Sequence, residues 1–499
     1  MNTRTLQDLV KGRYGRKIAY TSVPEITEEN VVSVLGEVIG VFNWNKPIIK
    51  YLWDYKNGDQ PVLYRVKTVR DDIVNVVVEN HAWEIVRFKN AQTYGEPVQY
   101  ISTSKDEKVS EAVDMLNRLA KVAGKRRKDV DSGEWTSAVG TGFKAIQRTN
   151  DPDIPFRIVA PTPMNTFVIY SQETDEALAA VQELKDAEKK NYYLVFTPTH
   201  EFRIQNSQLI PLEMNADGVA VYSRLHAFGG IPIIEYPNNQ SRISDIELVI
   251  SMLDAVNTMQ SNRMDGIEQF VQSWIKFVNC DIDEDTFAKM KMMGALVVKS
   301  NNGSENKADV DVMSQELNQS QAQVAKEDLF DNILSIEAIP NREGNTGGDT
   351  QGAVSLRNGW DLAKTAAKLK DAYIEEGDKK LAILMMNCLR ITSGANTNIV
   401  NALDFECQIN HSPQDNMMVK AEVFKLLAES GIHPKVAMES CGLWADSEKT
   451  YNVSKPYLDG LYKTVDELEK QAEKERQSAE TAQQETIRED KDEVIVDEK

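Results

Sequence analysis

The segment from Gly229 to Val271 constrains the fold of this chain more than any other stretch. Its apolar run from Ile231 to Tyr236 predicts a short strand, which ends at Pro237-Asn238-Asn239 because proline removes a backbone donor and asparagine favours turns. A helix cap at Ser241 or Ser244 follows, with Asp245 and Glu247 suited to the positive end of a helix. Helical spacing of apolar side chains then continues at Ile246, Ile250, Leu253, Val256, Met264, Ile267 and Val271.

This predicted helix is unusually long and polar. From Ser244 to Val271 it has about 28 residues and a length of roughly 40 Å. Its second side carries Glu247, Ser251, Asp254, Thr258, Asn262, Asp265 and Gln269. Such a helix is better placed between domains or in a shared assembly than inside one compact core.

A second long helix is predicted from Val310 to Ile339. Its first half is nearly devoid of large apolar residues, whereas its second half is rich in them. Half of it must therefore face water or a neighbouring chain through polar contacts. A small α/β insert separates the two long helices, with a strand at 273–278, a short helix at 283–293 and a strand at 295–299.

Acidic residues in this insert resemble the start of a calcium loop. The run Asp281, Asp283 and Asp285 has the right alternation, but Thr286 stands where the loop needs glycine and Met292 where it needs glutamate. We therefore reject a calcium site and expect these acids to cap the short helix.

The N-terminal half predicts helices followed by a sheet. Residues 1–25 are expected to form a flexible arm, and helices are expected at 27–41 and 105–123. Residues 69–90 could be helix or strand, and helix is favoured because the periodic stretch is long. Short strands separated by Pro-, Asn- and Gly-rich turns then predict a mixed, mainly antiparallel sheet, with strands at 143–148, 156–160, 166–170, 192–197, 201–205 and 219–225.

The C-terminal part is expected to be mainly helical. A long helix is predicted at 353–389, a strand at 405–410, and helices at 414–430 and 433–441. The last residues, 466–499, are rich in Glu, Gln and Lys and predict an acidic, disordered tail.

The strand and helix of the opening segment resemble a known signature. Ile231 to Asn239 followed by Ser244 to Asn257 is similar to the portal proteins of tailed double-stranded-DNA bacteriophages, of the siphophage type, and the similarity continues in order from about Ile26 to Tyr462. The resemblance implies a multidomain α+β fold. Its parts would be a wing at 26–240, a first stem helix at 241–272, a small α/β clip at 273–309, a second stem helix at 310–339, a tunnel loop at 340–352, a long wing helix at 353–404 and a helical crown at 405–465.

The resemblance also implies a function. Identical subunits would form a ring, a dodecamer in the virion, whose channel passes double-stranded DNA at one capsid vertex during packaging and ejection. The ring would dock the large subunit of terminase and later the head-tail adaptor proteins, and would contact major capsid and scaffolding proteins. Assembly would take place in the host cytoplasm, and the mature location would be the virion.

Candidate site residues follow from the same resemblance. The tunnel loop would include Asn341, Arg342, Gly344, Asn345, Gly347, Gly348 and Asp349. The stem residues lining the channel would be Glu316, Lys326, Glu327 and Asp331, and the clip would meet its partners through Trp274, Lys276, Asp283 and Lys289.

Charge limits how this chain can meet DNA. Its net charge of -20 is unfavourable for a protein that grips phosphates, and fits a surface that repels DNA or simply a soluble protein. The run Lys125, Arg126, Arg127 and Lys128 is the exception. It could contact DNA, form an exposed helix end, or pair with an acidic neighbouring subunit.

Neither cofactor, metal nor catalytic residues are expected. The Gly-rich segment 340–352 lacks the Gly-Lys-Ser/Thr ending of a phosphate-binding loop, and no apolar strand precedes it. The four cysteines are too widely spaced for a zinc site or a disulfide framework, and no apolar run reaches the roughly 20 residues that span a bilayer. Two other classes stay open, a capsid or head-tail adaptor protein without a DNA channel and a nucleotide hydrolase.

Overall fold

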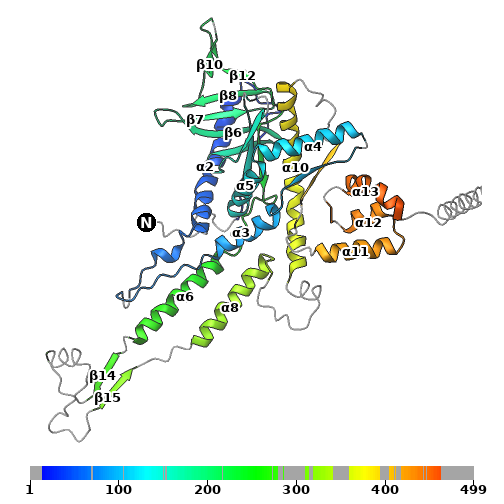
Figure 1. Cartoon of the computed structure of the whole chain (residues 1–499). Helices are drawn as coiled ribbons and strands as arrows, with labels where there is room; N and C mark the ends of the chain where they lie inside the picture. Colours follow the sequence, from blue (N-terminus) through cyan, green and yellow to red (C-terminus); the bar gives the residue numbers. More distant parts are fainter. Residues whose placement is uncertain are drawn as a thin grey trace, which may run out of the picture. The chain divides into compact units, whose positions relative to one another are not determined.

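The chain divides into two compact units, Met1–Pro413 and Gln414–Lys499. The computed structural model (Figure 1) describes residues 14–68, 71–104, 106–149, 151, 154–215, 217–271, 274–278, 285, 309–313, 319–340, 359–393, 404–409, 411, 417–441, 443–444 and 447–461. Within them helices and strands mix in an α+β fold, as the sequence predicts.

A seven-stranded sheet forms one part of the first unit. Its order is β1-β5-β6-β7-β8-β12, with β9 paired to β8. Neighbouring strands are antiparallel except β1 and β5, which are parallel, so the sheet is mixed. Its strands are β1 (Ala19–Thr21), β5 (Thr166–Ser171), β6 (Ala177–Lys185), β7 (Asn191–Phe196), β8 (His200–Gln205), β9 (Gln208–Ile210) and β12 (Ser223–Leu225). The short strands β10 (Glu213–Met214) and β11 (Ala220–Val221) pair with each other.

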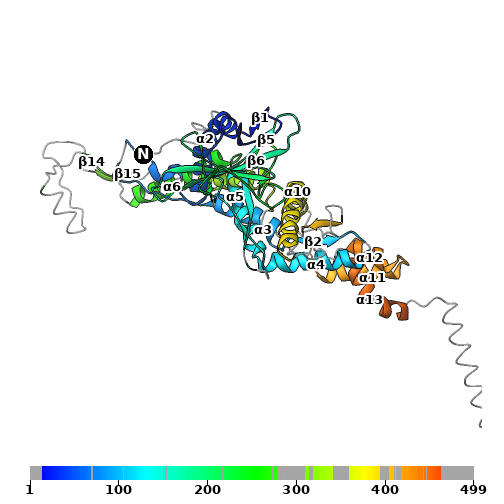
Figure 2. The ribbon, with the colours of Figure 1, turned by 90° about the horizontal axis from the view of Figure 1, so that it is seen from above.

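Helix α2 (Val31–Lys56) lies beside this sheet (Figures 1 and 2). The ring of Phe42 stacks on that of Phe167 with 4.6 Å between centroids, at the centre of a shared apolar core. The sequence predicts a helix only at 27–41, but the helix continues through Pro47 to Lys56. A 3-10 turn, η1 (Pro61–Tyr64), follows.

A three-stranded sheet and four helices form the centre of the first unit. The strand order is β13-β3-β4, for β13 (Ile233–Pro237), β3 (Thr141–Arg148) and β4 (Phe156–Val159). Around it lie α3 (His81–Tyr94), α4 (Glu107–Val122), α5 (Lys125–Val139) and α10 (Trp360–Ser393). A side chain at Gly140, where φ is +89°, would collide with the carbonyl oxygen of Arg242, so only glycine allows this close turn.

Two long helices leave this centre side by side (Figure 1). They are α6 (Ile250–Val271) and α8 (Gln319–Ile336). Beyond them β14 (Trp274–Val278) pairs antiparallel with β15 (Asp309–Met313). The second unit contains α11 (Met417–Glu429), α12 (Pro434–Cys441) and α13 (Ser447–Leu461).

Four expectations from the sequence are wrong in their bounds. The predicted helix at 69–90 begins only at His81, where the Asn80 side chain accepts from the Trp83 amide and caps it. Residues 14–25 are not a free arm, because β1 joins the large sheet and Arg16 is buried. Residues 310–313 form strand β15 rather than the start of the second stem helix.

The fourth correction concerns the expected crown. Strand β16 (Phe405–Gln408) pairs antiparallel with β2 (Gln99–Ser102), and Phe405 belongs to the core of the first unit. The helical C-terminal unit therefore starts at Gln414 rather than at residue 405. Strand β6, in the middle of the large sheet, is absent from the strands that the sequence predicts.

Among the described residues, no helix combines the length and apolar character needed to cross a bilayer. Nor do those residues include a group of three or more His, Cys, Asp or Glu side chains placed to hold a metal ion. In the described part of the chain Cys388, Cys407 and Cys441 are buried and are not joined in disulfides.

Candidate functional site

A capping box fixes the turns at residues 244–249, which lead into α6; the helix itself begins at Ile250 rather than at Ser244 as the sequence predicts. The Ser244 amide donates to Glu247 Oε2 at 2.8 Å, and the Ile246 amide donates to Ser244 Oγ at 3.1 Å. Glu247 also accepts from the Gly15 amide at 3.2 Å and pairs with the buried Arg16 guanidinium. The N-terminal segment therefore holds these turns in place.

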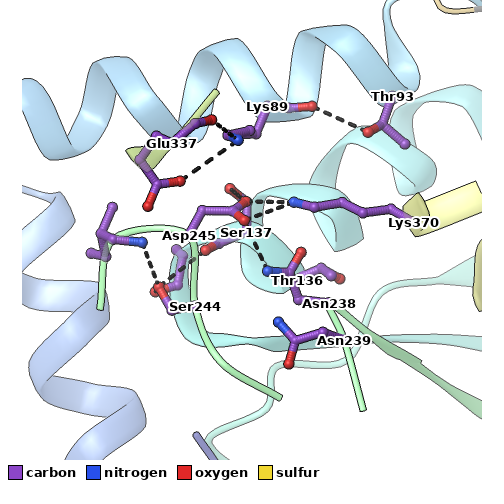
Figure 3. A network of polar contacts seen from close by, with 12 residues as sticks. Lys89, Thr93, Thr136, Ser137, Asn238, Asn239, Ser244, Asp245, Glu337 and Lys370 are labelled. Atoms are coloured by element: carbon purple, nitrogen blue, oxygen red, sulfur yellow. Dashed lines mark hydrogen bonds and ion pairs between the residues drawn. The ribbon is translucent and has the colours of Figure 1, made fainter. Parts of the chain in front are cut away.

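Asp245, two residues before Glu247, is the centre of a buried polar network (Figure 3). Its carboxylate accepts from Lys370 Nζ at 2.8 and 2.7 Å, from Ser137 Oγ at 2.6 Å and from Asn238 Nδ2 at 2.9 Å. Burial alone would raise the pKa of Asp245, but Lys370, Lys89 and Ser137 outweigh burial and lower it below its ordinary value. Asp245 thus joins the start of α6 to α5 and α10.

Glu337, directly after α8, enters the same network. Lys89 of α3 donates to the Glu337 carbonyl oxygen, and its Nζ lies 3.6 Å from Glu337 Oε2 (Figure 3). Burial, and then the nearby Asp245 charge, raise the pKa of Glu337 to about 7, against the opposite influence of Lys89 and Lys370. One buried cluster of charges therefore fixes the bases of both long helices to the body.

The polar side of α6 is covered by an extended segment, residues 73–79, which we call the strap. The amides of Asn75, Val77 and Glu79 donate to side-chain oxygens of Asp265 at 2.6 Å, Ser261 at 3.0 Å and Asn257 at 2.8 Å, respectively. Two residues of extended chain rise about 6.6 Å and four residues of helix about 6.0 Å, so alternate strap amides match every fourth helix residue.

This ladder explains why the polar side chains of α6 are not all exposed. Asn257 and Ser261 are fully buried and Asp265 is 4% exposed. Asp265 also pairs with Arg65 at 2.8 Å and with Lys67 at 2.6 Å. Sequence reasoning placed Asp265 and Glu247 on a side left to neighbours or water, but their own chain covers both. The four-residue spacing of 257, 261 and 265 is the signal that could have identified the ladder.

The predicted channel-lining residues of α8 have different surroundings. Lys326 pairs with Glu79 at the end of the strap, 2.7 Å away. Glu327 and Asp331 are exposed, and Glu327 accepts from Gln323 Nε2 at 2.6 Å. Glu316 lies outside the described residues.

The predicted basic cluster is divided by the fold. Arg126 and Arg127 are exposed, and Lys128 pairs with Asp131 at 3.0 Å. Lys125 is only 3% exposed, so it does not belong to a surface that could meet DNA. The prediction of DNA contact is kept for the other three residues alone.

Lys125 instead belongs to a buried quartet of charges that the sequence did not indicate. Lys125 Nζ lies 2.8 Å from Asp129 and 2.6 Å from Asp378, and Lys144 also pairs with both aspartates. Tyr236 donates its hydroxyl to Asp378 Oδ1 at 2.8 Å. Burial would raise the pKa of Asp378, but the two lysines lower it far below its ordinary value. The quartet joins α10 to α5 and β3.

Several predicted site residues cannot be placed. The tunnel-loop residues Asn341, Arg342, Gly344, Asn345, Gly347, Gly348 and Asp349 lie outside the described residues, as do Asp283 and Lys289 of the clip. Trp274 and Lys276 are in β14, with Trp274 opposite Met313 and Lys276 opposite Asp311.

Fold and site together define an α+β protein built around a pair of long helices that buried charges anchor at their bases. A family model described as "Phage portal protein, SPP1 Gp6-like" matches residues 38–481, so the chain belongs to this family of phage portal proteins. The resemblance drawn from the sequence is confirmed, and the chain is a structural component of a phage particle.

Comparison with curated proteins finds no match. Among solved structures, the chain is similar to a chain of the "Virion of native gene transfer agent (GTA) particle", at 11% identity and a TM-score of 0.40, over 73% of this chain and 89% of that one. It is also similar to a chain of the "Neck of empty GTA particle computed with C6 symmetry", at 9% identity and a TM-score of 0.42, over 73% and 90% of the two chains.

Proposed function

We propose that copies of this chain form a closed ring at one capsid vertex, a dodecamer in the virion, through which double-stranded DNA is packaged and later ejected. Ring closure requires one face of each subunit to meet a different face of the next. The observation that carries the proposal is the pair of long helices α6 and α8, which lie side by side, with the acids Glu327 and Asp331 of α8 exposed to solvent in the described part of the chain.

An acidic channel wall suits DNA that must move. Many cations on the wall would bind phosphates and slow the duplex, whereas an acidic or neutral wall lets it slide. The net charge of -20 and the exposed acids of α8 support such a wall. Energy for translocation would then come from a separate terminase, whose large subunit we propose docks at the clip through Trp274, Lys276, Asp283 and Lys289.

Other partners follow from the same proposal. Tunnel-loop residues 341–349 would project into the channel, and the ring would meet major capsid and scaffolding proteins during assembly in the host cytoplasm and head-tail adaptor proteins afterwards. Arg126, Arg127 and Lys128 would contact either DNA or an acidic face of the next subunit. The alternative is a capsid or adaptor protein without a DNA channel.

Charge reversal on the second stem helix tests the channel. We expect the double substitution Glu327→Lys and Asp331→Lys to leave rings intact but to lower the amount of DNA packaged with terminase in vitro severalfold, because new cations would hold phosphates. The packaged DNA length, measured after nuclease treatment, is the readout.

The matched control is Glu188→Lys, an exposed reversal in the turn between β6 and β7 of the large sheet. It should package DNA as the unmodified protein does. Normal packaging by the α8 double variant would show that these two residues do not lie on the channel wall, whereas failure of the unmodified protein to support packaging would favour the adaptor alternative.

A further inference from the structure

The carboxylates of Asp245 and Glu337, which lie at the bases of the long helices, receive unequal numbers of close polar contacts. Asp245 accepts four close contacts from Lys370, Ser137 and Asn238, between 2.6 and 2.9 Å. Glu337 Oε2 has Lys89 Nζ at 3.6 Å, longer than a hydrogen bond, although the Glu337 side chain is only 5% exposed. A buried carboxylate with so little support is expensive to ionise.

The backbone at the C-terminal end of α8, next to Glu337, has a strained conformation. The Ile339 amide donates to the Leu334 carbonyl at 2.8 Å and the Ala338 amide to the Ser335 carbonyl at 3.2 Å, which is a Schellman motif. Its left-handed position, with φ of +50°, is Ala338 rather than the usual glycine. A left-handed conformation is unfavourable for alanine, so contacts from outside the helix help to hold this end.

Lys89 supplies such a contact. Its ammonium group donates to the carbonyl of Glu337 at the negative end of the helix, where a cation is favourable. The charged groups that face Glu337 from the described elements packed against it are Lys89 of α3, Asp245 at the start of α6 and Lys370 of α10 (Figure 3). Attachment of α8 therefore depends on the charge balance of this one cluster.

We propose that Lys89 and Glu337 form a proton-operated latch on the end of α8, closed while Glu337 carries a proton and opening more often once Glu337 is ionised. In the closed state burial and Asp245 disfavour the ionised carboxylate, whereas in the open state water solvates it. The closed state thus binds the proton more tightly, so raising the pH favours opening. The latch requires only the fold of one subunit and is independent of whether a ring forms.

Hydrogen exchange of the full chain tests the latch. The readout is the protection of the peptide covering residues 333–340 at pH 6 and pH 8, corrected for the intrinsic pH dependence of exchange. With the pKa of Glu337 raised to about 7 in the closed state and ordinary in the open state, opening should increase about tenfold between these two pH values. The variant Glu337→Gln, which mimics the protonated side chain, should remain equally protected at both.

The matched control is Asp328→Asn, at an exposed acid of the same helix, which should show the tenfold change of the unmodified chain. The latch is wrong if the unmodified chain has the same protection at both pH values, or if Glu337→Gln keeps the pH dependence. Should Glu337→Gln fold poorly, exchange of the unmodified chain between pH 5 and pH 9 decides instead, because the latch requires a transition near neutral pH.

Discussion

At the scale of single residues, the fold depends on buried charges that are balanced pair by pair. Asp129 and Asp378 each contact both Lys125 and Lys144, and the Tyr236 hydroxyl adds a hydrogen bond. Breaking one member leaves a buried charge without a partner, which costs far more than losing an exposed pair. These side chains therefore hold α10 against α5 and β3 in the first unit.

Asp378→Asn should lower the free energy of unfolding by about 3–5 kcal/mol, because both lysines would then share one aspartate. The control is Asp131→Asn on α5, which removes only surface pairs, a half-buried one with Lys128 and one with the exposed Arg127, and should cost about 1 kcal/mol or less. Chemical denaturation followed by circular dichroism measures both. Equal losses in the two variants would show that the quartet contributes no more than a surface pair.

At the scale of elements, the strap and α6 behave as one unit. The strap amides have side-chain oxygens of the helix as partners instead of a neighbouring strand, and the ladder matches because the rises of the two elements nearly coincide. Through Glu79 the strap also reaches Lys326 of α8. The strap thus links the two long helices to each other.

Ser261→Ala should loosen the strap, because the Val77 amide would lose its buried partner at a cost of about 1–3 kcal/mol. Hydrogen exchange of the peptide covering residues 73–80 should become faster. Thr258→Ala, one turn earlier on the exposed side of α6, is the control and should leave this peptide unchanged. Unchanged exchange in Ser261→Ala would mean that the ladder does not hold the strap.

The sequence predicts the features whose interacting residues are close together in the chain. It misses those whose interacting residues are far apart in the chain. The strand at 233–237, the turn and the long helix follow from local spacing and capping, and the structure confirms them, although the helix begins at Ile250 rather than at Ser244. The strap was predicted as helix because it belongs to a long apolar stretch, 69–90, whereas its actual partners lie on α6, well over a hundred residues away.

The sequence also fails to predict the buried ion pairs of the candidate sites. Lys125 looked like part of an exposed basic run, but Asp378, its partner 253 positions later, is brought beside it only when α10 packs on α5. Arg16 looked like part of a solvated arm for the same reason, since its partner is Glu247. Periodicity and capping report local structure, and buried ion pairs are set by the tertiary fold.

At the scale of the whole molecule, the phage portal family and the paired helices support the proposed ring. The described part of one chain covers α6 with the strap and with α8, and anchors both through Asp245 and Glu337. The side chains of α8 that remain exposed are largely polar and acidic. In a ring those sides would face a neighbouring copy or the channel, as heterologous closure requires.

Electron microscopy of the purified full-length protein tests this ring most directly. We expect particles with rotational symmetry and a central hole, because the exposed sides of the two long helices are to be covered by further copies around an axis. Compact single-chain particles, or sheets and closed shells without a central hole, under conditions where the protein is folded, would contradict the ring and with it the proposed DNA channel.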